Sequence, residues 1–405
     1  MLSRFYRATS DHAGRVRLEL VDAPVEGIAV IDGCLAGPRV RVATRAVLVA
    51  VEPDGALCGR PVDPLELREG ALCFDPSQGG VRTRENRRAR GAFNRLVVEA
   101  DRFGMVNAYV HADRAAQFFN ALLSDLGASP LPMLHVVVGA HFGSKLPGYG
   151  CGDGDRRSSA LRPLSGGHYR LSTRTTGVPE LLPVEPGGEM HLGPSRYRKP
   201  FAGWDAYLRN AAHNPAIVYH EFGHHLCRHT ADFRLNAERT PAMQRNGKTG
   251  IEEGICDYFA AVLLGSGRPY GWYRADRGRR RDPELPRHAS ERDSHSDAHA
   301  VGATWAGAWW RVRSELVAQG HLQSGFDHDR ALAQALLAVG EVGRAGKRRT
   351  RTKRQARRSS PTTMLSAYLG AVCEAADPSG ANVAAAIMEQ YGLLDDCEQQ
   401  EPTRC

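Results

Sequence analysis

Apolar and polar residues alternate along the first part of the chain as they do in β-strands. Four such runs, RVRLEL, GIAVID, RVRV and AVLVAV, fall within residues 15–52, and Asp, Gly and Pro separate them, as is typical of short strands joined by turns. Farther along, LHVVVGAH at 134–141 predicts a buried strand and GGEMHLG at 187–193 predicts an edge strand. The pattern therefore predicts a small β-rich unit over residues 1–90 and further strands after it.

Apolar residues recur at helical spacing in the middle and last parts of the chain. They do so from Val106 to Gly127, and again from Ile251 to Leu264, where the next residue is a glycine that predicts a C-terminal cap. Asn214 predicts the start of an intervening helix, because its side chain can cap unpaired backbone donors. The proline that follows costs no hydrogen bond, since the N–H at the first helical position has no partner within the helix. Three or four more helices are expected, around 301–319, 328–339, 361–375 and 381–391, with Pro361 as a start signal and Gly392 as a stop.

These elements predict an α+β fold. After the small β-rich unit at 1–90 we expect a lobe at 91–275 with strands and a central helix, then a helical lobe at 276–395 and a tail at 396–405. A chain of 405 residues can build a sizeable core. No run of eighteen or more apolar residues occurs in it, so no membrane span is predicted.

The helix that opens after Asn214 contains HEFGHH, in which His220 and His224 are four residues apart. Both imidazoles therefore project from one helix face and can bind one metal ion. Glu221 sits one step round the helix, from where its carboxylate can take a proton from a water on the metal without binding the ion itself. The alternative interpretation is an exposed His/Glu face of an ordinary helix. A catalytic zinc ion has three protein ligands and one open position, so the third ligand decides between these interpretations.

Two arrangements of a third ligand can be tested against the sequence. A third histidine soon after the motif is excluded, because Thr230 stands where it would be. The segment from Glu252 to Asp257 instead offers Glu253 and, one turn later, Asp257. These two carboxylates share a helix face, so one can bind the metal while the other orients an imidazole ligand. A pair of solvated charges at a helix start is the alternative.

With HExxH followed by this ExxxD spacing, the chain resembles the gluzincin metallopeptidases, especially the thermolysin-like and fungalysin-like families. The resemblance covers about 105–310 and is specific over 214–258. It implies a zincin-like fold in which His220, His224 and Glu253 hold one catalytic zinc ion, Glu221 acts as the base and Asp257 orients His220. Glu252 departs from the pattern, since thermolysin-like enzymes often have Asn there.

The segment from His299 to Ala306 resembles the HxxGExWA segment of the fungalysin-like family, although Ala303 replaces its Glu. This resemblance implies that His299 donates a hydrogen bond to the oxyanion formed during peptide hydrolysis. His288 and His295, in the polar loop before it, are alternatives for this role. The other interpretation of His299 is an exposed residue at a helix start.

The cysteines and aspartates add further candidate ligands. Nine cysteines without a CxxC pair predict thiols rather than disulfides in a chain of this size. Cys227 shares the helix face of the two histidines, and Cys256 lies beside Asp257. A thiolate ligand would make the site closed and structural, whereas the alternative is inert packing between two helices. Asp153 and Asp155 offer carboxylates for Ca2+, but the run lacks a full ligand series, which favours an ordinary turn.

The net charge of +8 comes from one segment. Residues 344–358 contain nine basic and no acidic residues, and removing them leaves −1 for the rest of the chain. Such a segment can bind phosphates, but without aromatic residues for stacking on bases we expect a solvated, disordered insertion. The first residues lack the apolar segment of a secretory signal, so the chain as written is expected in the cytoplasm, and secretion is expected if the gene start is truncated.

Together these features predict a zinc-dependent metallopeptidase that acts on peptide or protein substrates. The resemblance favours endopeptidase activity, because in these families an extended chain can pair with an edge strand of the cleft, which GGEMHLG resembles. Two alternatives remain open at this point. One is a zinc-stabilised binding module without proteolytic activity, and the other is a nucleic-acid-associated protein that uses residues 344–358.

Overall fold

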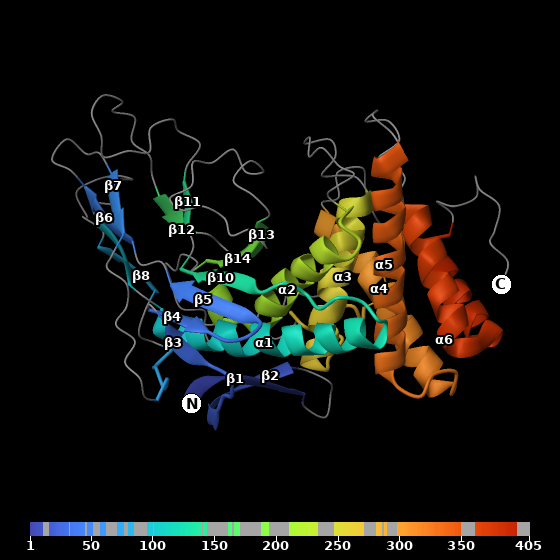
Figure 1. Cartoon of the computed structure of the whole chain (residues 1–405), viewed down its shortest axis with the longest axis horizontal. Helices are drawn as coiled ribbons and strands as arrows, with labels where there is room; N and C mark the ends of the chain where they lie inside the picture. The colour runs from blue at the N-terminus through green and yellow to red at the C-terminus, as the bar shows by residue number, and fades with distance from the viewer. Residues whose placement is uncertain are drawn as a thin grey trace. The chain divides into compact units, whose positions relative to one another are not determined.

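A computed structural model of the chain has a mixed α+β fold (Figure 1), as the sequence predicts. The structure describes residues 1–10, 16–31, 33–44, 47–51, 57–61, 71–76, 80–84, 95–99, 101–139, 141–143, 161–163, 166–170, 188–193, 210–233, 247–270, 281–285, 287–289, 298–349 and 361–394. None of its described helices combines the length and the apolar character needed to cross a bilayer. The chain divides into two compact units, one of Met1–Ala8, Leu18–Ala116 and Pro132–Phe222, the other of Thr9–Arg17, Gln117–Leu131 and Gly223–Cys405. The predicted boundaries at residues 90 and 275 do not coincide with this division.

The strands form one larger sheet and several smaller ones. Their bounds are β1 Leu2–Ser10, β2 Val16–Pro24, β3 Ala29–Ile31, β4 Cys34–Ala36, β5 Val40–Thr44, β6 Val47–Val51, β7 Leu57–Pro61, β8 Gly80–Arg84, β9 Arg95–Glu99, β10 Leu134–Val138, β11 His141–Gly143, β12 Leu161–Pro163, β13 Gly167–Arg170 and β14 Glu189–Leu192. The six-stranded sheet has the order β13-β14-β10-β5-β4-β3, the four-stranded sheet the order β7-β6-β9-β8, and β1-β2 and β11-β12 are two-stranded. Strands β3 to β5 thus share a sheet with β10 and β14, and the strands of residues 15–52 do not form a sheet of their own.

Strand β14 was predicted as an edge strand, and that prediction is wrong for the described sheet. It pairs in parallel with β10 and antiparallel with β13, with His191 opposite Val137 on one side and His168 on the other. All four of its residues are buried, as expected for a strand with neighbours on both sides. The outermost described strand at this end is β13, whose four residues were too few to predict from their pattern.

Helix α1 (Arg102–Asp125) lies beside the six-stranded sheet in the first unit (Figure 1). It starts four residues before the predicted Val106, because the Asp101 carboxylate accepts a hydrogen bond of 2.7 Å from the Gly104 N–H and caps the first turn. Arg39, next to β5, forms an ion pair of 2.8 Å with Asp113. This contact ties the helix to the central strands.

The remaining helices lie where the sequence predicts helices, and several of their ends differ from the predicted ones. They are α2 (Pro215–His229), α3 (Gly247–Leu264), α4 (Ala298–Ala318), α5 (Gly325–Arg349) and α6 (Pro361–Gln390). Gly265 and Gly392 have φ of 67° and 69°, and so provide the left-handed caps that the sequence predicts. The two predicted helices at 361–375 and 381–391 are present as the two parts of α6, which are separated by a kink at Asp377, whose φ of 71° and ψ of 171° are not helical.

Helix α5 is longer than predicted and corrects the interpretation of the basic segment. It was expected to end near residue 339 but runs to Arg349, so residues 344–349 are helical rather than part of a disordered insertion. Arg and Lys have high helix propensity, so a basic run can extend a helix that packing has already formed. Residues 350–358 lie outside the described part of the chain.

Helices α3 and α4 cross in close contact because glycines face each other there. A Cβ added to Gly302 would lie 2.6 Å from the Gly254 nitrogen and 2.8 Å from the Gly250 carbonyl oxygen, and one added to Gly254 would lie 2.7 Å from the Gly302 oxygen. Backbone atoms cannot yield as side chains can, so the crossing requires the absence of a Cβ. The first turn of α4 is thereby brought to the side of α3 that carries Glu253.

The Gly302→Ala substitution tests this crossing. The added methyl group would push two backbones apart, so we expect the free energy of unfolding to fall by about 1–3 kcal/mol. The control is Gly370→Ala in α6, where an added Cβ meets nothing within 4 Å, so that helix propensity should raise stability by about 0.5–1 kcal/mol. Urea unfolding of both variants makes the comparison, and equal stabilisation would contradict the proposed crossing.

Candidate metal centre

Helix α2 carries the HEFGHH sequence and begins where Asn214 and Pro215 predict. The Asn214 side-chain oxygen accepts a hydrogen bond of 3.0 Å from the Ala216 N–H, which satisfies one of the unpaired donors of the first turn. His220, Glu221 and His224 are all buried. The alternative of an exposed His/Glu helix face is therefore excluded by their burial.

A buried hydrogen-bond chain fixes the first half of α2. The Tyr219 hydroxyl is 2.8 Å from His111 Nδ1, and His111 Nε2 is 2.8 Å from the Tyr6 carbonyl oxygen. Burial lowers the pKa of His111 to about 3, so the ring is neutral. Because a carbonyl only accepts, Nε2 donates to Tyr6 and Nδ1 accepts from Tyr219. The residue next to His220 is thus held in place by a satisfied neutral network.

A glycine in the middle of the motif allows α2 to approach α3. A Cβ added to Gly223 would lie 2.7 Å from the Cys256 Cα and 2.9 Å from its Sγ, so no larger residue fits without separating the helices. Glycine inside a helix costs about 1 kcal/mol relative to alanine, and the close approach accounts for its presence. Gly223 was not predicted as a contact residue, although it lies inside the motif.

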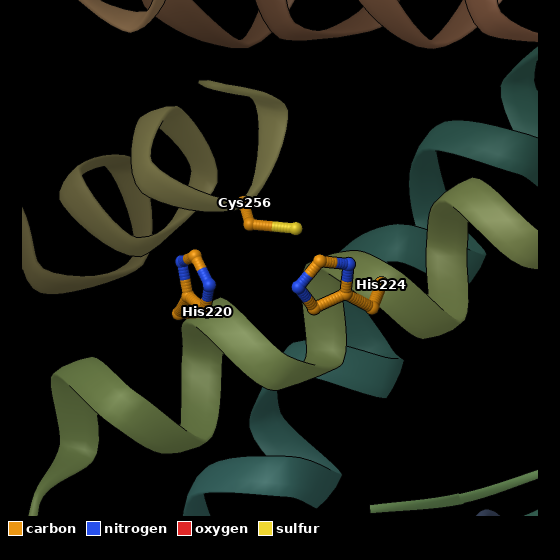
Figure 2. A group of neighbouring side chains, drawn as sticks. All are labelled: His220, His224 and Cys256. Carbon is orange, nitrogen blue, oxygen red and sulfur yellow. The ribbon is translucent and has the colours of Figure 1, made fainter. Parts of the chain in front are cut away.

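Two overlapping groups of potential ligands lie around this contact. His220, His224 and Cys256 each offer one ligand atom, and these three atoms lie within 4.8 Å of one another. Figure 2 shows the two imidazoles on consecutive turns of α2 and the Cys256 sulfur of α3 directed toward them. His220, Glu253 and His299 form the second group under the same limit. The arrangement is compatible with a bound metal ion and leaves the identity of the ion open.

His224 lies between two consecutive glutamates of α3. Its Nδ1 is 2.8 Å from Glu252 Oε1, and its Nε2 is 3.7 Å from Glu253 Oε2. A carboxylate accepts from Nδ1–H and so leaves the Nε2 lone pair available for a metal ion. Glu252, which the sequence placed only as a departure from the family pattern, is therefore the residue that orients this imidazole.

The Glu253 carboxylate faces two imidazoles from two helices. Oε2 is 3.7 Å from His224 Nε2 and 3.3 Å from His299 Nε2. Two ligand atoms at 2.0–2.1 Å from a tetrahedral zinc ion lie about 3.3 Å apart, so both separations are close to those of shared coordination. The structure places His299 at the same group of side chains, and its predicted role at the oxyanion stays a prediction.

Glu221 is covered by the first residue of β13. A Cβ added to Gly167 would lie 2.5 Å from Glu221 Cγ and 2.8 Å from its Oε1. The strand backbone therefore passes directly over this side chain and restricts its rotamers. Gly167 was missed in the sequence, because a glycine in a Gly-rich stretch gives no signal of what it contacts.

Asp257 lies fully buried one turn beyond Glu253 and holds an arginine. Arg281 donates to it from Nε at 2.9 Å and Nη2 at 2.6 Å, and the Tyr270 hydroxyl donates at 2.7 Å. These bonds anchor the middle of α3 to the segment that follows it. The predicted role of Asp257 in orienting His220 stays a prediction.

The other residues predicted as candidates for the oxyanion or Ca2+ roles lie either away from this group of side chains or outside the described residues. His288 packs against the end of α6, where its Cε1 would lie 2.7 Å from a Cβ added to Gly392. Asp153, Asp155 and His295 lie outside the described residues, and so does any test of the Ca2+ site.

The cysteines whose side chains the structure describes are thiols and form no disulfides, as the sequence predicts. Cys34, Cys73, Cys227, Cys256 and Cys373 form no disulfide. Burial and a hydrogen bond with Cys227 raise the pKa of Cys256 well above its usual range, so its thiol is protonated when no cation is beside it.

Comparison with known proteins identifies no family for the chain. No protein-family model matches the chain, and neither does any curated protein sequence. Fold and site geometry therefore carry the functional argument alone.

The Glu252→Gln substitution tests how His224 is oriented. An amide holds the Nδ1–H less strongly and can also present its NH2 group, so we expect metal affinity to fall about 10–100-fold. Competition with a chelating dye measures the affinity. Glu284→Gln is the control, since Glu284 pairs with Arg268 on the surface. Equal affinities in both variants would remove Glu252 from the site.

Proposed function

We propose that the chain hydrolyses peptide bonds, with a zinc ion held by His220, His224 and Glu253 and with Glu221 as the general base. The observation that carries the proposal is the position of His224 between two glutamates. One glutamate orients Nδ1 at 2.8 Å, and the other presents Oε2 to Nε2 at 3.7 Å. An imidazole that is oriented through Nδ1 and faces a carboxylate through Nε2 is an arrangement that binds zinc in enzymes.

The donor set suits this ion. Imidazole nitrogen and carboxylate oxygen are both zinc ligands. The two buried histidines on one helix face present their nitrogens with little freedom of rotation. A zinc ion in such a set acidifies a water molecule and polarises a carbonyl group. Glu221, one residue after His220, is placed to take the proton of the attacking water and deliver it to the leaving amine.

Strand β13 supports the choice of an extended substrate. It is the outermost strand of the six-stranded sheet in the described residues, and its first residue, Gly167, lies over Glu221. A peptide that added a strand beyond β13 would run past this carboxylate and be bound mainly through its backbone. His299, with 43% of its side chain exposed, is the proposed hydrogen-bond donor to the oxyanion.

Glu221→Gln tests the base. Glutamine keeps the shape but cannot take a proton, so we expect the hydrolysis of an unstructured protein to fall about 100- to 10,000-fold while the zinc content is unchanged. Metal analysis and a fluorescent peptide library measure the two properties. A fully active Glu221→Gln protein would exclude this mechanism. Gly167→Ala should also lower the rate without loss of zinc, because it displaces Glu221 and touches no ligand.

Glu253→Ala tests the ligand. Removing one of three protein ligands should strip zinc from the purified protein, whereas Glu284→Ala on the surface should leave it bound. Zinc content measured by atomic absorption makes the comparison. Full occupancy in Glu253→Ala would mean that another side chain supplies the third ligand.

A zinc-stabilised binding module without proteolysis is the second candidate. The observation that favours it is Cys256, whose sulfur lies within ligand distance of both histidines. A site filled by protein ligands alone is structural. Zinc that resists exchange, with no cleavage of the peptide library by the native chain or by any ligand variant, would support this candidate over the peptidase.

A further inference from the structure

Four side chains with metal-binding atoms lie along the contact of α2 with α3, with Cys256 in one group of potential ligands and Glu253 in the other. His220 and His224 come from consecutive turns of α2, and Glu253 and Cys256, three residues apart, come from one face of α3. The Cys256 sulfur points toward both imidazoles (Figure 2) and lies within 4.8 Å of a nitrogen of each. Glu253, in turn, is 3.7 Å from His224 Nε2. Both residues of α3 thus reach the same histidine.

We propose that Cys256 is a fourth protein ligand of the metal ion and that its thiolate keeps the site closed to water. The proposal rests on the proposed function, since it concerns the same ion. Two imidazoles, a carboxylate and a thiolate complete a tetrahedral zinc site, and such a site has no position for a water molecule. When the thiolate binds, the thiol proton is released to solvent. The chain as folded is then latent, and hydrolysis requires Cys256 to leave the metal.

Burial and helix contact both favour thiolate binding. Cys256 is completely buried, so its sulfur is available only to its immediate neighbours. Gly223 holds the Cys256 backbone against α2, between the turns that carry the histidines. The sulfur therefore does not need to move through the core to reach the ion. Zinc accepts sulfur at about 2.3 Å, a little farther than nitrogen or oxygen, which suits the larger atom at this position.

Cys227 is the hydrogen-bond partner of Cys256, and its substitution is the control for that of Cys256. It lies one turn after Gly223 on α2, and its thiol hydrogen bonds with that of Cys256. The sulfur makes this hydrogen bond from the same position in which it lies within 4.8 Å of a nitrogen of each histidine. Cys227 itself belongs to neither group of potential ligands in the described residues. The two buried cysteines therefore differ in whether the sulfur lies within reach of both histidines, which is the property under test.

Cobalt(II) replacing zinc in the full chain reports directly on sulfur ligation. A thiolate bound to Co(II) gives an intense charge-transfer band in the near ultraviolet, whereas nitrogen and oxygen ligands give only weak visible bands. We expect this band in the native chain and in Cys227→Ala, and its loss in Cys256→Ala. Cobalt should remain bound in all three, because His220, His224 and Glu253 are intact.

The outcomes separate this inference from the proposed function. Bound cobalt with tetrahedral visible bands and no charge-transfer band in the native chain would overturn the thiolate ligand and leave the metal site standing. A native chain that binds no cobalt would overturn both. The native spectrum needs no variant, so a failure of Cys256→Ala to fold would not prevent the test.

Hydrolysis tests the latency. Cys256→Ala opens one position at the metal and should cleave an unstructured protein several-fold faster than the native chain, while Cys227→Ala should match the native rate. Equal rates in native chain and Cys256→Ala, with the charge-transfer band lost in the variant, would mean that the thiolate does not keep water out, and would overturn the latency.

Discussion

The close contact of α3 with α2 and with α4 is the constraint on which the candidate metal centre depends. Gly223 allows the α2 backbone to touch Cys256, and Gly254 and Gly302 allow α3 and α4 to meet backbone to backbone. A side chain at any of these positions would separate helices by the size of a methyl group or more. Because the ligand distances are a few ångströms, such a displacement exceeds what a metal site tolerates.

The same contact explains why neighbouring residues of α3 can take different roles. Glu252 and Glu253 are adjacent, so their side chains leave the helix about 100° apart. With α2 held so close, His224 is reached by both, one at Nδ1 and the other at Nε2. A more distant helix could place only one of them at this ring. Two consecutive residues of α3 thus face the two nitrogens of one imidazole.

Local sequence patterns predicted most of the helices and strands. The features that they did not predict depend on tertiary contacts. Asn214 and Pro215 start α2 as predicted, since capping depends on adjacent residues alone. Strand β14 was misplaced at an edge because its neighbour β13 is short and separated from it by a Gly- and Pro-rich stretch. Strand order depends on such pairings, which no single strand encodes.

For the site, spacing predicted which residues would share a helix face but could not predict what those faces meet. HExxH places His220 and His224 together by helix geometry, and the structure brings Glu253 near both histidines and His299 near His220 and Glu253. Glu252 and Gly167 were not foreseen as functional residues, because their roles come from contacts with His224 and Glu221 across 28 and 54 residues of chain. Glycine and a departure from a family motif give no local signal of such contacts.

The buried carboxylates of this centre are compatible with a bound cation. Glu221, Glu252 and Asp257 are buried, and an ionised carboxylate in the interior costs several kcal/mol unless a positive charge offsets it. Arg281 supplies that charge to Asp257. Glu252 and Glu253 instead contact imidazoles, which are neutral when they bind a metal ion through nitrogen. A divalent ion at the histidines would supply the positive charge that these imidazoles then lack, so the carboxylates and the candidate ligands depend on one another.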